Sequence, residues 1–96
     1  MIDPEEIVAC IGFDWDGKVL RRHGVTTEEC EEAFGNAPVV VSDDAGHSLR
    51  ERRHHAMGHT DAGRVLFISF TIRNNLIRVI SARSASRKER KEYPGP

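Results

Sequence analysis

The sequence has few of the features that mark a secreted or membrane protein. It contains only two cysteines, Cys10 and Cys30, in 96 residues, which are too few for the disulfide framework of a small secreted domain. No apolar run approaches the roughly 20 residues that cross a bilayer. The start, MIDPEEIVACIG, lacks the basic region and the apolar stretch of a signal peptide. We therefore expect a cytoplasmic protein without a membrane anchor.

The chain also lacks internal repeats, low-complexity tracts and a Gly/Ser-rich linker. Its length of 96 residues predicts one domain over residues 1–96. Hydrophobic residues make up 39% of the sequence and charged residues 30%, and a domain of this size buries roughly 60–65% of its unfolded surface. We expect a thin core and modest stability.

Neither sign of charge dominates the chain, whose net charge is −1, but the charges are unevenly distributed. Residues 1–34 carry nine acidic and three basic side chains, whereas residues 64–96 carry eight basic and two acidic ones. The basic C-terminal third suits a polyanionic partner. Alternatively, the two ends attract each other across the fold, and charge alone does not separate these interpretations.

Local patterns predict an α+β fold, with a β-sheet, two N-terminal helices and a short C-terminal helix. Asn74 and Asn75 favour a two-residue hairpin, because Asn tolerates positive φ better than most residues. Thr26 or Thr27 can cap a helix whose apolar stripe contains Cys30, Ala33 and Phe34. Strands are expected over 11–15, 39–41, 52–57, 64–72 and 76–83, and helices over 18–23, 28–34 and 87–93.

The predicted hairpin implies a register. A two-residue loop pairs Arg73 with Leu76, Thr71 with Arg78 and Leu66 with Arg83. One face of the hairpin then collects an apolar set that suits a core. The other face collects Phe67, Ser69, Thr71, Arg73, Arg78 and Ile80, and guanidinium groups there suit a phosphate ligand.

Arg73, Arg78 and Arg83 are the first candidate site residues. Phosphoryl transfer without a metal needs fixed positive charge where the phosphorane oxyanion develops, and arginine binds phosphate oxygens through two N–H groups at once. The alternative is that these residues leave their strands to pair with the acidic N-terminal third.

The tail SARSASRKERKEY is the second candidate. It contains Arg87, Lys88, Arg90, Lys91 and Tyr93, and a basic helix with an aromatic residue suits contact with an RNA backbone and stacking on a base. The alternative is a solvated helix held by neighbouring charges.

The histidines, together with Glu51, are the third candidate. His55 and His59 would bind zinc together from one side of a helix, but their context predicts strand and turn, so we expect no metal site. An acid–base role for one histidine is the stronger hypothesis. His23 precedes Gly24 and could instead complement a helix C-terminus, and Glu51 could be a salt-bridge partner or a general base. The remaining histidines in the second half of the chain are His47 and His54.

Several of these residues together resemble the BrnT family of ribonuclease toxins from type II toxin–antitoxin systems. F-D-W-D at 13–16, R-H-G-V at 22–25 and I-S-A-R at 80–83 match in order, over roughly residues 12–93. Residues 1–11 are an N-terminal extension outside the pattern. Further matches are Glu51 and Arg53, Gly58, Gly63–Arg64, Thr71 and Arg73, and the closing Arg87, Arg90 and Tyr93.

The resemblance implies a fold like that of RelE-type toxins, with an antiparallel sheet flanked by helices. It also implies metal-independent RNA cleavage without a cofactor, and inhibition by a cognate, BrnA-like ribbon-helix-helix antitoxin through which alone the toxin would contact DNA. Carried over by position, Arg78 and Arg83 would stabilise the transition state, and Glu51 or His23 would be the base or the acid. Arg53, Arg73, Arg87, Arg90 and Tyr93 would bind RNA.

Two other classes of function stay open. The first is a non-catalytic RNA- or protein-binding module of the same fold, which keeps the basic hairpin but not the chemistry. The second is an interaction protein whose acidic and basic ends associate.

Overall fold

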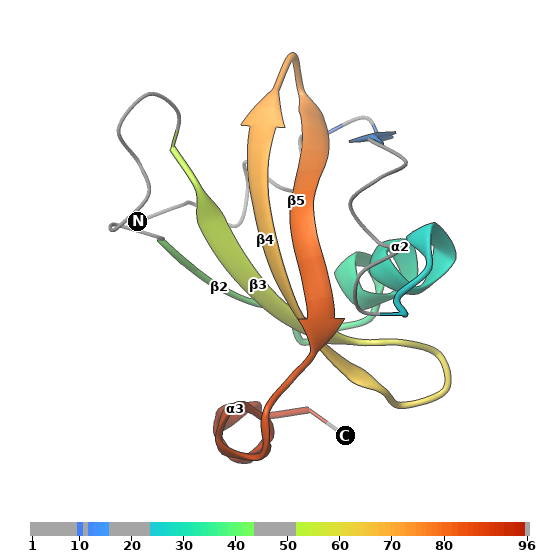
Figure 1. Cartoon of the computed structure of the whole chain (residues 1–96), viewed down its shortest axis with the longest axis vertical. Coiled ribbons are helices and arrows are strands. Elements are labelled where there is room, and N and C mark those ends of the chain that lie inside the picture. The colour runs from blue at the N-terminus through green and yellow to red at the C-terminus, as the bar shows by residue number, and fades with distance from the viewer. Residues whose placement is uncertain (1–9, 11, 16–23, 44–51, 96) are drawn as a thin grey trace.

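The fold is built on a five-stranded sheet in a computed structural model that describes residues 10, 12–15, 24–43 and 52–95. The strands lie in the order β1-β5-β4-β3-β2, with β4 and β5 at the centre (Figure 1). Strand β1 runs parallel to β5, and all other neighbours are antiparallel. The elements are β1 (Gly12–Asp14), α2 (Thr27–Gly35), β2 (Val40–Asp43), β3 (His54–His59), β4 (Val65–Arg73), β5 (Leu76–Ser84) and α3 (Arg87–Glu92).

The predicted α+β class is confirmed, but the prediction of a wholly antiparallel sheet is wrong. Strand β1 joins the sheet at its β5 edge, more than sixty positions away in the sequence, so no hairpin fixes its direction. The first described helix, α2, lies in the middle of the chain's N-terminal half rather than at its start. The helix predicted over 18–23 lies outside the described residues.

Helix α2 begins where the sequence places its cap. The Thr26 hydroxyl accepts the backbone N–H of Glu29, and the Glu29 carboxylate accepts the backbone N–H of Thr26 in return, which is a capping box. The apolar stripe then turns Cys30 and Ala33 inward, and both are fully buried. Burial raises the pKa of the Cys30 thiol to about 12, so this thiol is a core residue.

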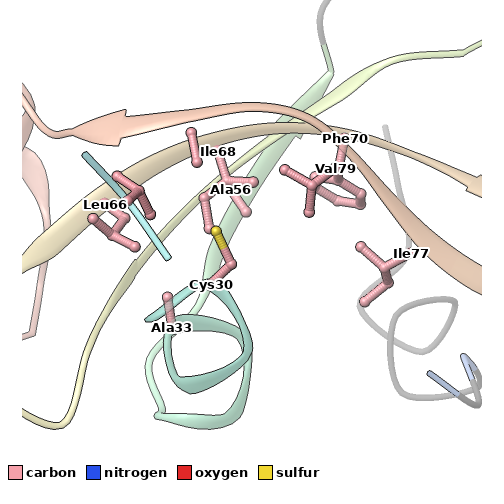
Figure 2. Packing of buried hydrophobic residues seen from close by; sticks show 10 residues of the cluster. Cys30, Ala33, Ala56, Leu66, Ile68, Phe70, Ile77 and Val79 are labelled. Atoms are coloured by element: carbon pink, nitrogen blue, oxygen red, sulfur yellow. The ribbon is translucent and has the colours of Figure 1, made fainter. Parts of the chain in front are cut away.

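The core lies between α2 and one face of the sheet. Figure 2 shows Cys30 and Ala33 of α2 beneath side chains that point down from the strands. Gly58 of β3 permits this approach, because a Cβ there would lie 2.3 Å from the Ala33 carbonyl oxygen. The buried strand residues beneath which α2 packs are Ala56, Leu66, Ile68, Phe70, Ile77, Val79 and Ala82.

The β4–β5 hairpin follows the predicted register only near its turn. Asn74 and Asn75 have φ values of 52° and 61°, as a two-residue turn requires. The pairs from the turn to Phe70 and Val79 are as predicted, but Ser69 then pairs with Ser81, so Ile80 is an extra residue in a β-bulge.

The bulge makes the predicted pairing of Leu66 with Arg83 wrong. Beyond Ile80 the side chains of β5 change faces, and Ala82 rather than Ser81 fills the core beside Ile68. Arg83 now pairs with Phe67, on the face turned away from α2.

Helix α3 follows the end of β5 (Figure 1). The Ser86 hydroxyl and the Glu89 carboxylate form a second capping box. The chain then returns to the sheet at Tyr93, which is 5% exposed and packs with Val65. The Tyr93 hydroxyl donates to the Pro38 carbonyl oxygen at 2.6 Å and lies 2.7 Å from His59 Nδ1. These contacts fix α3 against the end of the sheet.

Candidate functional site

The face of the sheet turned away from α2, called here the outer face, gathers most of the predicted site residues. Alternation along the strands assigns side chains to it, because every second residue points away from the core. The bulge at Ile80 brings Arg83 onto the same face as Arg78. The outer face contains Asp14, His55, Met57, His59, Val65, Phe67, Ser69, Thr71, Arg73, Arg78 and Arg83.

Three arginines surround Thr71 at the hairpin end of the outer face. Arg78 pairs directly with Thr71, and Arg73 is the diagonal neighbour of Arg78, at a distance of roughly 7–8 Å in such pairs. Arg53 precedes β3 and, by continuation of the register from the pair His54–Phe70, lies level with Thr71. The Thr71 hydroxyl is itself bound to the Arg52 carbonyl oxygen at 2.7 Å. Positive charge is therefore concentrated around a neutral, buried threonine.

Arg83 lies about 13 Å from Arg78 along the outer face, since the two pair with β4 residues four positions apart. Its Nη1 and Nη2 atoms donate to the two oxygens of Glu89, at 2.7 and 3.0 Å, and Nη1 also donates to the Ser84 carbonyl oxygen. Among the contacts of the described residues, the Nε–H edge of the guanidinium is not used. That edge can donate two parallel N–H groups to an oxyanion while Glu89 stays bound.

Electrostatics hold the Arg83–Glu89 pair together. The hydrogen bonds from Arg83, against the opposing effect of burial, lower the pKa of Glu89 to about 2. The same bonds raise the pKa of Arg83. The guanidinium is thus a permanent cation whose orientation is set by a permanently ionised carboxylate.

An aromatic ring separates Arg83 from a histidine. The Arg83 Cζ atom lies 4.5 Å from the centre of the Phe67 ring, within the range of a cation–π contact. The imidazole of His55 lies 4.7 Å from the Phe67 ring centre, at an interplanar angle of 51°. Guanidinium, phenyl and imidazole therefore form a row across β5, β4 and β3.

The basic side chains of α3 extend this positive surface. Arg87, Lys88, Arg90 and Lys91 are all exposed. An open hollow of about 430 Å³ lies between the helix and the start of β4, and it is lined by Gly63, Val65, Arg87, Arg90, Lys91 and Gly95.

Three predicted site residues need separate comment. His23 and Glu51 lie outside the described residues. Tyr93 is buried, its pKa is raised by that burial, and its hydroxyl is bound to Pro38. In this structure Tyr93 holds α3 in place, and its ring is not exposed for stacking on a base.

Ion pairs partly explain the uneven distribution of charge along the chain. Arg78 lies 3.4 Å from Asp14, and Arg64 lies 3.1 Å from Glu29. Basic and acidic thirds therefore do attract each other, as one interpretation of the sequence holds. The cations of α3 remain on the surface, so this attraction does not account for the whole basic segment.

The three described histidines have different environments. His54 is buried and its Nδ1 lies 3.1 Å from Asp43, while His59 is bound to Tyr93. His55 is half-buried on the outer face. Within the ranges that the structure describes, no three His, Cys, Asp or Glu side chains converge to hold a metal ion, and no helix there is long and apolar enough to cross a membrane.

The sequence gave no specific reason to select Phe67 or to prefer His55 over the other histidines. The alternation of β4 indicates that Phe67 faces away from the core, where a large aromatic residue is unusual. That signal could have drawn attention to the residues that pair with and flank it.

Comparisons with known proteins identify the family. No curated protein matches the chain. Residues 13–89 match the family model described as the ribonuclease toxin BrnT of type II toxin–antitoxin systems, and this span contains every strand of the sheet except the first residue of β1. The chain therefore belongs to the BrnT family of ribonuclease toxins.

Proposed function

We propose that this protein is a metal-independent endoribonuclease whose RNA substrate lies across the outer face. The observation that carries the proposal is the bulge at Ile80, because it gives Arg83 and Arg78 a common face. Family membership supports a ribonuclease toxin with an antitoxin partner. The fold class is compatible with the RelE-like architecture that the resemblance implies.

The proposed reaction needs no group beyond the side chains and the RNA. The ribose 2′-oxygen attacks the adjacent phosphorus while the bond to the 5′-oxygen breaks, giving a 2′,3′-cyclic phosphate and a 5′-hydroxyl. A base accepts the 2′ proton and an acid protonates the 5′-oxygen. Glu51 or His23 is proposed for one of these roles.

The arginines divide between chemistry and binding in this proposal. Arg78 and the Nε edge of Arg83 stabilise the negative charge that develops on the phosphorane. Arg53 and Arg73 hold the neighbouring phosphate, and Arg87 and Arg90 bind the RNA backbone next to α3. Tyr93 contributes by fixing α3, unless RNA draws its ring out of the sheet.

The proposed partner in the cell is a ribbon-helix-helix antitoxin of the BrnA type. It would cover the basic outer face, and DNA would be contacted only through it. Its binding in the cytoplasm would keep RNA from the same arginines.

Cleavage of RNA by the purified protein in EDTA tests this proposal. We expect 2′,3′-cyclic phosphate and 5′-hydroxyl ends, and a rate about 10²–10³-fold lower in Arg78→Ala and in Arg83→Ala. Lys88→Ala removes one positive charge from the same surface and should cleave at nearly the wild-type rate. Full activity of both arginine variants would refute the assignment of the site, and cleavage that requires a divalent metal would refute the mechanism.

One observation favours a second candidate, a non-catalytic RNA-binding module. Glu89 already occupies two Nη atoms of Arg83, which reduces the positive charge that a phosphate would meet there. Salt-sensitive RNA binding by the folded protein without any cleavage would support this alternative.

A further inference from the structure

We propose that His55 is the general acid of the cleavage reaction, an inference that rests on the proposed function. Its imidazole lies in the row with Phe67 and Arg83 on the outer face, where the scissile phosphate is proposed to bind. No motif in the sequence singles it out.

The position of His55 follows from the sheet. It pairs with Ser69 of β4 on one side and Ser42 of β2 on the other, so it lies inside the sheet and not at its edge. Both neighbours are small and polar, which leaves the space above the imidazole to a ligand. The phenyl ring of Phe67 supports one side of the imidazole and fixes its direction.

The other described histidines are committed elsewhere. His54 is buried with Asp43 on the core side, and His59 is bound to the Tyr93 hydroxyl. His55 is the described histidine that is half exposed beside Arg83.

The distances suit division of labour across one phosphate. Arg83 Cζ lies 4.5 Å from the Phe67 ring centre on the β5 side, and the imidazole centre lies 4.7 Å from it on the β3 side. The two groups are therefore within about 9 Å of each other, across a single ring. A phosphate above Phe67 would have the guanidinium on one flank and the imidazole on the other.

The charges that face His55 define its role. Arg53 lies two residues back on the same strand, Arg83 lies across Phe67 with Glu89 bound to it, and β2 and β4 contribute only Ser42 and Ser69. Imidazole gains and loses a proton near neutral pH. A protonated His55 gives its proton to the 5′-oxygen as the phosphorus–oxygen bond breaks, and a carboxylate such as Glu51 is suited to accept the 2′ proton.

The test compares His55→Ala and His55→Gln with the wild type on two substrates. One is ordinary RNA, and the other has a 5′-bridging sulfur at the cleavage site, whose thiolate leaves without a proton. On ordinary RNA we expect kcat to fall about 10²–10⁴-fold with KM little changed, and the alkaline limb of the pH–rate profile to disappear. On the sulfur substrate both variants should approach the wild-type rate.

Three controls make the result decisive. Ser42→Ala changes the direct neighbour of His55 and should leave the rate unchanged, and Arg83→Ala should stay slow on the sulfur substrate. Thermal unfolding of each variant verifies the fold, and His55→Gln preserves side-chain bulk if His55→Ala does not fold. Wild-type rates in both His55 variants, or a defect that the sulfur substrate does not relieve, would overturn this inference alone. Absence of cleavage by the wild type would overturn the proposed function as well.

Discussion

Arg83 is held on two sides, by the carboxylate of Glu89 and by the ring of Phe67. A guanidinium fixed in this way loses little side-chain entropy when an anion binds. Glu89 also completes the capping box of α3, so the same carboxylate orients the arginine and starts the helix. Orientation of the arginine and formation of α3 are therefore coupled through a single residue.

This coupling predicts a pH dependence of stability. The pKa of Glu89 is lowered from 4.5 to about 2 in the folded chain, chiefly by hydrogen bonds from Arg83. A lowered folded-state pKa gives stability that is complete above pH 4.5 and is lost as the pH falls toward 2. We expect Glu89→Gln to lower the melting temperature at neutral pH and to flatten the decline between these pH values.

Glu92→Gln is the matched control, because Glu92 is an exposed residue of the same helix. Thermal unfolding from pH 2 to pH 7 measures both variants. Equal pH profiles for Glu89→Gln and the wild type would show that the Arg83–Glu89 pair does not contribute to stability.

At the scale of elements, the packing of α2 on β3 depends on one glycine. Gly58→Ala would place a methyl group 2.3 Å from the Ala33 carbonyl oxygen, so the helix must move away from the sheet. Overpacking of this kind costs about 1–3 kcal/mol. We therefore expect chemical denaturation to show a free energy of unfolding lower by that amount.

Gly35→Ala tests whether the effect comes from the contact or from the loss of a glycine. Gly35 ends α2 and has no atom within 4 Å of an added Cβ, so alanine there should be neutral or slightly stabilising. If Gly58→Ala were as stable as Gly35→Ala, the close approach of α2 to β3 would be contradicted.

The elements differ in how far their sequences determine them. The caps of α2 and α3 and the Asn74–Asn75 turn are local, and their predictions are confirmed. The bulge at Ile80 is not local, because it depends on whether Ser81 or Ala82 fits the core opposite α2. The parallel pairing of β1 with β5 likewise depends on contacts between distant parts of the chain.

These two non-local features are also the ones that shape the candidate site. The bulge turns Arg83 toward the outer face, and β1 brings Asp14 to Arg78. Sequence reasoning could therefore identify the arginines as candidates but could not establish that they share a face. The roles of His23 and Glu51 stay predictions.

At the scale of the whole molecule, the two faces of the sheet have separate tasks. One face packs on α2 and provides the core, while the outer face and α3 display basic side chains (Figure 1). The acidic N-terminal third contributes Asp14 and Glu29, which neutralise Arg78 and Arg64 in part. A net charge of −1 therefore coexists with a basic surface.

Expression of the chain without an antitoxin, followed by mapping of RNA 5′ ends, tests the central claim most directly. The account predicts growth arrest and new 5′-hydroxyl ends in cells that make the wild type, and neither in cells that make folded Arg83→Ala at the same level. Normal growth with intact RNA, from wild-type protein shown to be folded and abundant, would contradict it.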